Sequence, residues 1–306
     1  MSVTGSRKYS LSDFFSGYFS NYGRLLLSNL LFCIPLAVFI GILVLISQFV
    51  ENLSWFIIFL LIPFMSPFFA GLTNVCRKLT AEKAVRPVKD FFSGIKDNWL
   101  FFLINSILLY ALTSGMFVML ALNRQADSGA VTFYFIIISL TSLLFVLIEF
   151  SALTMSVSVE LGFADIFKNS ILLVGKGIVN HLKTLFALLF VAFFMYSIAA
   201  LINSFIPLLV VYGILCLLSL PTLIMYIIVF NSYQTVDKYV ISPFSQESRR
   251  EEQKRLDKQK DEELTIEELE PLAAGDPEEY VFLNGKTVKR KTVIKMIEVK
   301  KNTQQS

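Results

Sequence analysis

Histidine, cysteine and charged residues are scarce in this 306-residue sequence. It has one histidine, His181, so a histidine-based metal cluster and a Ser/His/Asp arrangement both lack the residues they need. Its three cysteines, Cys33, Cys76 and Cys216, have unrelated spacings, which indicate neither a disulfide framework nor a zinc motif. We therefore expect a protein that is not an enzyme and that carries no metal and no cofactor.

Charge is low in amount and unevenly distributed. Charged residues make up 17% of the chain and hydrophobic residues 55%, with a mean hydropathy of +0.65; a soluble domain carries about 25% charged residues. Residues 1–244 hold 14 Lys/Arg and 10 Asp/Glu, whereas residues 245–306 hold 13 and 14. The composition indicates an apolar body with a polar tail. It excludes a soluble α/β enzyme, a disulfide-stapled secreted domain and a nucleic-acid binder.

Long apolar runs are what the sequence has in abundance. A helix needs about 20 apolar residues to cross about 30 Å of hydrocarbon. Six runs are long enough: 25–49, 54–75, 98–122, 130–157, 182–204 and 207–231. They are continuous rather than alternating, which favours helices over barrel strands. We expect an all-α membrane protein with an N-terminal segment 1–24, a six-span domain 25–235 and a charged tail 236–306.

Basic residues beside the runs predict the orientation, because they concentrate on the cytoplasmic side of membrane proteins. The opposite side has only Arg124. The predicted cytoplasmic side has the other basic residues of the body: Arg7, Lys8, Arg24, Arg77, Lys78, Lys83, Arg86, Lys89, Lys96, Lys168, Lys176, Lys183 and Lys238. Both termini should therefore be cytoplasmic.

A short motif recurs before each odd-numbered run. Asp-Phe-Phe-Ser-Gly at 13–17 returns at 90–94, and a weaker copy, Asp-Ile-Phe-Lys-Asn, follows at 165–169. We therefore predict three repeated hairpins, each preceded by an amphipathic helix at the cytoplasmic interface. The aspartates form either a symmetric cation or partner site or favourable first-turn residues of a helix. The motif residues are Asp13, Phe14, Phe15, Asp90, Phe91, Phe92, Asp165 and Phe167.

Further motifs are spread over residues 10–235. They are Phe14-Phe15, Gly23-Arg24-Leu25-Leu26, Asn29-Leu30-Leu31, Pro67-Phe68-Phe69-Ala70-Gly71-Leu72, Arg77, Asp90-Phe91-Phe92, Lys96-Asp97-Asn98-Trp99, Val159-Glu160-Leu161 and Lys168-Asn169-Ser170. Together they resemble the YesL family, bacterial integral membrane proteins with a domain of unknown function. The resemblance implies a place in the bacterial plasma membrane and an accessory role in carbohydrate transport or sensing. It further implies an ABC permease or a sensor kinase as partner.

Glu149 is the one acid inside a predicted span. An ionisable group at this depth is a functional-site hypothesis by default, for proton coupling or for contact with a polar substrate. Its expected partners are Asn105 or Ser106 of the third span, or Ser151 nearby. The alternative is a carboxyl that is hydrogen-bonded between helices and has only a structural role. His181, beside Lys183, is expected at the level of the lipid headgroups.

The tail has two predicted parts. Mixed charges predict a solvated helix over 245–269, and residues 271–277 are expected to form a linker. Residues 280–288 then predict a β-hairpin that turns at Asn284-Gly285. Basic residues around it appear nearly unopposed by acids along the sequence: Lys286, Lys289, Arg290, Lys291, Lys295, Lys300 and Lys301. Anionic lipid headgroups, a docking partner and plain solvent each account for them.

Two hypotheses on function follow. The first is a non-catalytic membrane protein that assists transport or sensing machinery and that has membrane lipids around it. The second is a small transporter or channel with its path between the hairpins near Glu149. The spans supply few polar side chains for such a path, which favours the first hypothesis.

Overall fold

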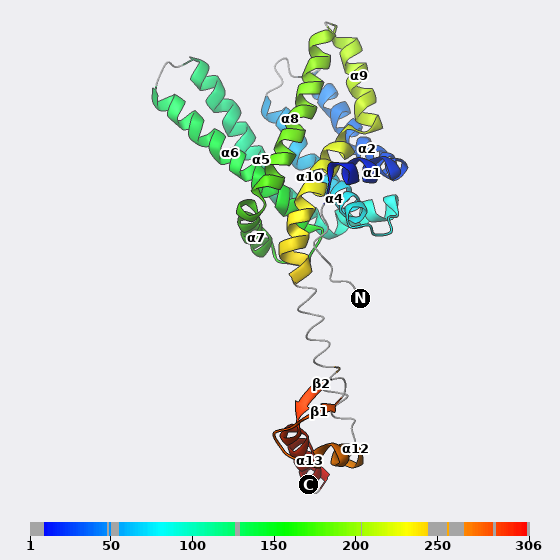
Figure 1. The fold of residues 1–306 in the computed structure, drawn as a ribbon. Helices are drawn as coiled ribbons and strands as arrows, with labels where there is room; N and C mark the ends of the chain where they lie inside the picture. The colour runs from blue at the N-terminus through cyan, green and yellow to red at the C-terminus, as the bar shows by residue number, and fades with distance from the viewer. Residues whose placement is uncertain are drawn as a thin grey trace. The chain divides into compact units, whose positions relative to one another are not determined.

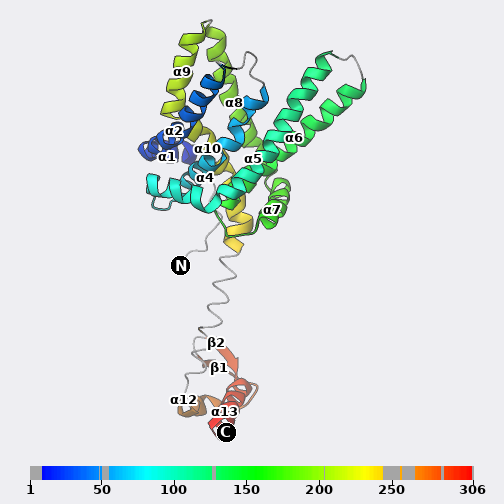
Figure 2. The same cartoon turned by 180° about the vertical axis from the view of Figure 1, so that it is seen from behind.

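The computed structural model describes residues 9–47, 49, 55–125, 129–202, 204–243, 256, 266–283 and 286–304. The chain divides into two compact units, residues 1–241 and 242–306. Figures 1 and 2 show that the first unit is built from helices. Its helices are α1 (Leu11–Ser20), α2 (Tyr22–Ser47), α3 (Trp55–Phe59), α4 (Leu61–Thr80), α5 (Pro87–Gln125), α6 (Gly129–Ser156), α7 (Phe163–Lys176), α8 (Ile178–Leu201), α9 (Phe205–Leu218), α10 (Leu220–Val236) and the π-helical turn η1 (Asp237–Ile241).

Several of these helices are suited to a bilayer. Within the described residues, five are long and apolar enough to cross one: Tyr22–Ile46, Ile57–Thr80, Pro87–Arg124, Gly129–Ser156 and Ile178–Leu201. A further pair, Phe205–Leu218 and Leu220–Ile241, passes the same test only as a span bent by 50°. The first unit is therefore the body of an all-α, multi-pass membrane protein.

The helix boundaries differ from the predicted ones at the second repeat. Residues 87–97, expected as a separate interfacial helix, form one continuous helix with the span that follows. The first and third copies are separate helices, α1 and α7, because Asn21 and Gly177 end them. Gly94 does not end α5, since it lies against α4 and the helix continues through it. The prediction of a separate second interfacial helix was wrong.

α10 is the centre of the first unit. It packs against α2, α4, α6 and α8, and in both views it runs between the other helices. Its Tyr226 and Phe230 belong to a buried cluster that also receives Phe14 from α1. The Phe14 ring lies 5.2 Å from the Tyr226 ring and 5.3 Å from the Phe230 ring. The phenylalanine of the first repeat motif is thus a packing residue that fixes α1 to the core.

The last apolar run is broken rather than continuous. The span predicted over 207–231 consists of two helices, because α9 ends at Leu218 and α10 begins at Leu220. Pro221 has no N–H, so the carbonyl of Leu217 cannot find the helical partner four residues on. The break therefore leaves backbone groups that need other partners inside the membrane body.

Asn29 on α2 supplies these partners. Its Nδ2 donates to the carbonyl oxygens of Cys216 at 2.7 Å and of Leu217 at 2.9 Å. Its Oδ1 accepts from the Thr222 N–H at 3.2 Å and from Thr222 Oγ1 at 2.6 Å. Asn29 is fully buried, so one amide satisfies both ends of the break. Cys33 lies on the same side, with its Sγ 3.5 Å from the Cys216 carbonyl oxygen.

The α4–α5 crossing depends on two glycines. A Cβ on Gly94 would lie 2.7 Å from Asn74 Cβ and 2.8 Å from the Ala70 carbonyl oxygen, and 3.1 Å from Gly71 Cα. A Cβ on Gly71 would lie 2.8 Å from the Phe91 carbonyl oxygen. Small residues allow two helix backbones to approach this closely.

Replacing Gly94 by alanine should therefore destabilise the protein by about 1–3 kcal/mol, because the two backbones must separate to admit one methyl group. Gly41→Ala is the matched control, since nothing lies within 4 Å of its added Cβ. Thermal unfolding of the purified variants in detergent measures both. Equal melting temperatures for Gly94→Ala and Gly41→Ala would contradict the close crossing.

The second unit has a small core of its own. It contains α12 (Ile266–Ala273), β1 (Tyr280–Leu283), β2 (Lys286–Lys289) and α13 (Arg290–Gln304). The strands pair antiparallel, with Tyr280 opposite Lys289 and Leu283 opposite Lys286; the predicted turn at 284–285 lies outside the described residues. Leu269, Leu283, Val293 and Ile297 form the core. Pro271, expected to open a linker, lies instead inside α12, where it removes one backbone donor without ending the helix.

Four of the seven basic residues predicted to be nearly unopposed, Lys289, Arg290, Lys291 and Lys301, have acidic partners, so the prediction was wrong for these four. Glu278 pairs with Lys289 at 2.5 Å and with Lys291 at 2.9 Å. Arg290 pairs with Glu279 at 2.5 Å, and Lys301 pairs with Glu270 at 3.4 Å. The acids come from 11 to 31 residues earlier in the chain, so the fold had to bring them near. Most of the predicted solvated helix, over 245–269, lies outside the described residues.

These pairs predict a pH dependence of the second unit. Hydrogen bonds from Lys289 and Lys291 hold the pKa of the Glu278 carboxyl below its ordinary value, which is about 4.3. Because the folded-state pKa is lowered, the stabilisation is present above pH 4.3 or so and is lost as the pH falls through the folded-state pKa. The protection factors of the α13 amides, which are the exchange rates of an unfolded chain divided by those of the protein at the same pH, should fall slightly below about pH 4 in the wild type. Glu278→Gln should abolish that acid-dependent step; an unchanged step would show that other acids cause it.

Candidate functional site

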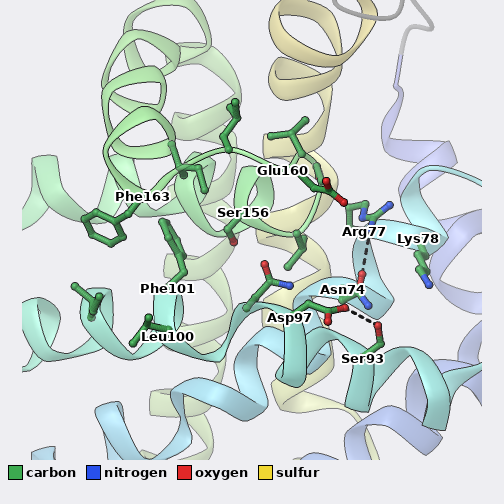
Figure 3. Close-up of a pocket in the computed structure, with 17 residues that line it drawn as sticks. Asn74, Arg77, Lys78, Ser93, Asp97, Leu100, Phe101, Ser156, Glu160 and Phe163 are labelled. Carbon is green, nitrogen blue, oxygen red and sulfur yellow. Dashed lines mark hydrogen bonds between the residues drawn. The ribbon is translucent and has the colours of Figure 1, made fainter.

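A pocket of about 510 Å³ lies where four segments of the first unit meet. Its lining comes from the end of α4, the first part of α5, the segment 157–162 and the start of α7 (Figure 3). Its volume is in the range of small-molecule sites. The lining residues include Arg77, Asp97 and Glu160, three charged residues from motifs that carry the family resemblance.

The wall between α4 and α5 is held by Asp90. Its Oδ2 accepts from the Arg86 N–H at 2.7 Å, which caps the start of α5, and its Oδ1 accepts from Lys78 Nζ at 2.6 Å. Asn74 Nδ2 donates to the Asp90 carbonyl oxygen at 2.8 Å. Asp90 therefore joins the two helices, and Lys78, although it lines the pocket, already has a partner.

Arg77 is the cation of the pocket that lacks an acidic partner. One of its terminal nitrogens donates to Asn74 Oδ1 at 3.1 Å, and its buried Nε has no hydrogen-bond partner in the described part of the chain. Asp97 accepts a hydrogen bond from Ser93 at 2.8 Å. No ion pair within 4 Å joins Arg77 to Asp97 or to Glu160 among the described residues. The guanidinium thus has no acidic side chain in ion-pair contact among the described residues.

The pocket has a charged end and an apolar end. Figure 3 shows Arg77, Lys78, Ser93 and Glu160 on one side and Phe101 and Phe163 on the other. The two aromatic rings lie 5.3 Å apart. Further apolar side chains, Leu100, Ile104, Leu161 and Ile166, also line it. The site is therefore shaped for a molecule with a polar head and an apolar remainder.

The repeat aspartates serve helix starts in two of the three copies. Asp13 Oδ2 accepts from the Ser10 N–H at 2.8 Å and from Ser10 Oγ at 2.9 Å, so it forms a capping box. Asp90 caps α5 as described, and Asp165 lies in the first turn of α7. Among the described residues, no group of three His, Cys, Asp or Glu could hold a metal ion. These contacts match the prediction that the aspartates favour first helical turns.

The repeat phenylalanines divide between core and surface. Phe91 is buried, and Phe14 packs on the main core. Their neighbours Phe15 and Phe92 are 49% and 54% exposed, which suits contact with lipid. Phe167 stacks on Phe163, a residue of the pocket. The motif is therefore mainly a packing device.

Glu149 is buried, 7% exposed, near the end of α6. The prediction of its hydrogen-bond partners was wrong. The amide nitrogen and oxygen of Asn105 and the Oε1 of Glu149 are all buried without a partner among the described residues. Ser106 donates to the Leu103 carbonyl oxygen at 2.7 Å, as serines in helices often do. None of Glu149, Asn105 and Ser106 lines the 510 Å³ pocket.

His181 is fully buried near the start of α8. Its Nε2 is 3.2 Å from Ser151 Oγ, and its ring stacks on Phe150 with the centroids 6.3 Å apart. Ser151, one of the partners expected for Glu149, is therefore joined to the histidine. α10 packs against both α6 and α8, which encloses this contact between them.

Sequence reasoning missed the pocket and the role of Asn29. Charged residues just beyond the ends of three predicted spans were the available signal for the pocket. For the role of Asn29, the available signal was an amide side chain inside an otherwise apolar run. Comparison with known protein families, with curated proteins and with solved structures finds no match. The resemblance to the YesL family therefore stays a prediction.

Proposed function

We propose that this chain is a non-catalytic, multi-pass protein of the bacterial plasma membrane that assists carbohydrate transport or sensing machinery. The carbohydrate role and the assignment to the bacterial plasma membrane rest on the resemblance to the YesL family. The observation that supports an accessory role over transport is the place of the pocket. It lies near the end of α4, in the first part of α5 and between the end of α6 and the start of α7, and it reaches only the first turns of the apolar run 98–122.

The proposed topology has six spans in three hairpins with both termini cytoplasmic. The pairs α5/α6 and α8/α9 have their connecting ends on the same side of the unit, away from α7 (Figures 1 and 2). The basic residues at and beside the connection of α4 to α5, such as Lys83 and Lys89, belong to the opposite side. The positive-inside rule makes that side cytoplasmic.

Affinity purification from native membranes tests the accessory role. The full chain, solubilised in mild detergent, should retain an ABC permease subunit or a sensor kinase, identified by mass spectrometry. A chain that lacks residues 245–306 should then show whether the second unit takes part in that contact. Recovery of neither class of partner from membranes where the carbohydrate systems are expressed would contradict the proposal.

A transporter or channel is the second candidate, and the buried polar atoms favour it. Glu149 Oε1, the Asn105 amide, His181 Nδ1 and Ser232 Oγ are all buried and unpartnered within the described residues. Proteoliposomes that contain only this chain, loaded with a pH-sensitive dye and challenged with maltose or glucose gradients, separate the two candidates. The accessory role predicts no flux of protons or sugar. Flux that Glu149→Gln abolishes, while Glu82→Gln leaves it intact, would establish transport instead.

A further inference from the structure

The pocket of Figure 3 lies at the expected depth of the lipid headgroups. Arg77 follows the predicted end of the second span at residue 75, and Asp97 precedes the predicted start of the third at 98. Ser158 follows the predicted end of the fourth span at 157, and all three residues line the pocket. Three span boundaries predicted from the sequence therefore meet at one cavity, where polar lipid heads and apolar chains are both within reach.

The charges of the pocket require a ligand that carries both signs. Arg77 lines the pocket with a guanidinium that forms no ion pair within the described residues, and such a fork binds phosphate or carboxylate oxygens. Lys78 is neutralised by Asp90, at 2.6 Å. Asp97 and Glu160 then leave the pocket with one net negative charge, which disfavours a dianion and favours a group that also brings a cation.

The apolar end of the pocket opens toward the outer surface of the helices. Leu100 is 53% exposed, Phe163 39% and Ile104 38%, and all three line the cavity. An apolar chain attached to a bound head can therefore leave along this rim without entering water. A ligand with a purely polar body would leave these side chains uncovered.

We infer that this pocket binds an amphiphile whose head joins an anionic group to a primary ammonium group. The anion pairs with Arg77, the ammonium is held by Asp97 and Glu160, and the apolar part lies along Leu100, Phe101 and Phe163. Two sources have this chemistry: an ethanolamine phospholipid and a free amino acid with an apolar side chain. The exposed apolar rim favours the phospholipid.

Lipid retention by the full chain tests the inference. The protein is reconstituted in phosphatidylcholine nanodiscs with equal minor amounts of phosphatidylethanolamine and phosphatidylglycerol, extracted briefly into detergent, and analysed by native mass spectrometry. The ethanolamine lipid should be retained in preference to both others. Arg77→Met should lower its retention by about tenfold, because one charge-assisted pair is lost. Lys83→Met, an exposed cation that does not line the pocket, should change nothing.

A second variant covers the case in which Arg77→Met fails to fold. Glu160 makes no hydrogen bond to a described residue, so Glu160→Gln should fold normally and lose the preference for ethanolamine over choline heads. In nanodiscs of phosphatidylcholine alone, titration with phenylalanine tests the other source. Phenylalanine binding that depends on Arg77 and Glu160 would support recognition of an anionic group joined to an ammonium group, with a soluble amino acid as the ligand. Preferential retention of phosphatidylglycerol, or no effect of either variant in both assays, would overturn the inference.

Discussion

Replacing Asn29 by leucine should lower the free energy of unfolding by about 3–6 kcal/mol, because four hydrogen bonds at the α9–α10 break disappear together. The carbonyls of Cys216 and Leu217 and the N–H and hydroxyl of Thr222 would all lose the same partner. They lie within an apolar part of the membrane body, where water cannot easily replace the lost partner. Thermal or SDS-induced unfolding of the purified variant, followed by size-exclusion chromatography, measures the loss.

Asn231→Leu is the matched control for this change. Asn231 also lies in the α10 region, but its Nδ2 donates only to the Ile227 carbonyl oxygen of its own helix, at 3.1 Å. That carbonyl is already the acceptor of a helical bond, so its loss should cost less than about 1 kcal/mol. A similar cost for both variants would show that Asn29 has no special role at the break.

A second substitution tests why Asn29 is needed. Pro221→Leu supplies the N–H that the Leu217 carbonyl would meet in a continuous helix. In that background, Asn29→Leu should cost at least about 1 kcal/mol less than it does in the wild type. Equal costs in the two backgrounds would show that Asn29 stabilises the protein for a reason other than the break at Pro221.

The helices were predictable from sequence where a long apolar run determines them. The spans near α2, α6 and α8 followed directly from hydropathy, since a bilayer-crossing helix needs a run of that length. The complete break at Ser219 did not follow, because a proline such as Pro221 can either kink a membrane helix or start a new one. The outcome depends on whether a neighbour such as Asn29 receives the freed groups.

The candidate site was harder to predict than the fold. Glu149 could be identified from a single stretch of sequence, because it is an acid inside a predicted span. The pocket instead combines Arg77, Asp97 and Glu160, each unremarkable at the end of its own span and brought together only by tertiary packing. The same reason explains the second unit, where Lys289 and its partner Glu278 are 11 residues apart. Local sequence shows charges, whereas their pairing is a property of the fold.

Replacing Val293 by aspartate should unfold residues 266–304 while leaving the unfolding of the membrane body unchanged. Val293 is fully buried in a core of four side chains, all contributed by the second unit itself. A unit of this size has a low free energy of unfolding, because it buries a small apolar area. Burying a carboxylate without a partner costs several kcal/mol, roughly the whole stability of such a small unit. Hydrogen exchange of the amides in β1 and α13, measured on the full chain, should lose its protection.

Val299→Asp makes this expectation specific to the core. Val299 lies on the same helix, α13, but is 64% exposed, so its replacement adds the same charge without burying it. Exchange protection should therefore persist in Val299→Asp and vanish in Val293→Asp. Protection that survives in both would mean that Leu269, Leu283 and Ile297 do not form a cooperative core. Loss in both would assign the effect to charge on α13 and not to burial.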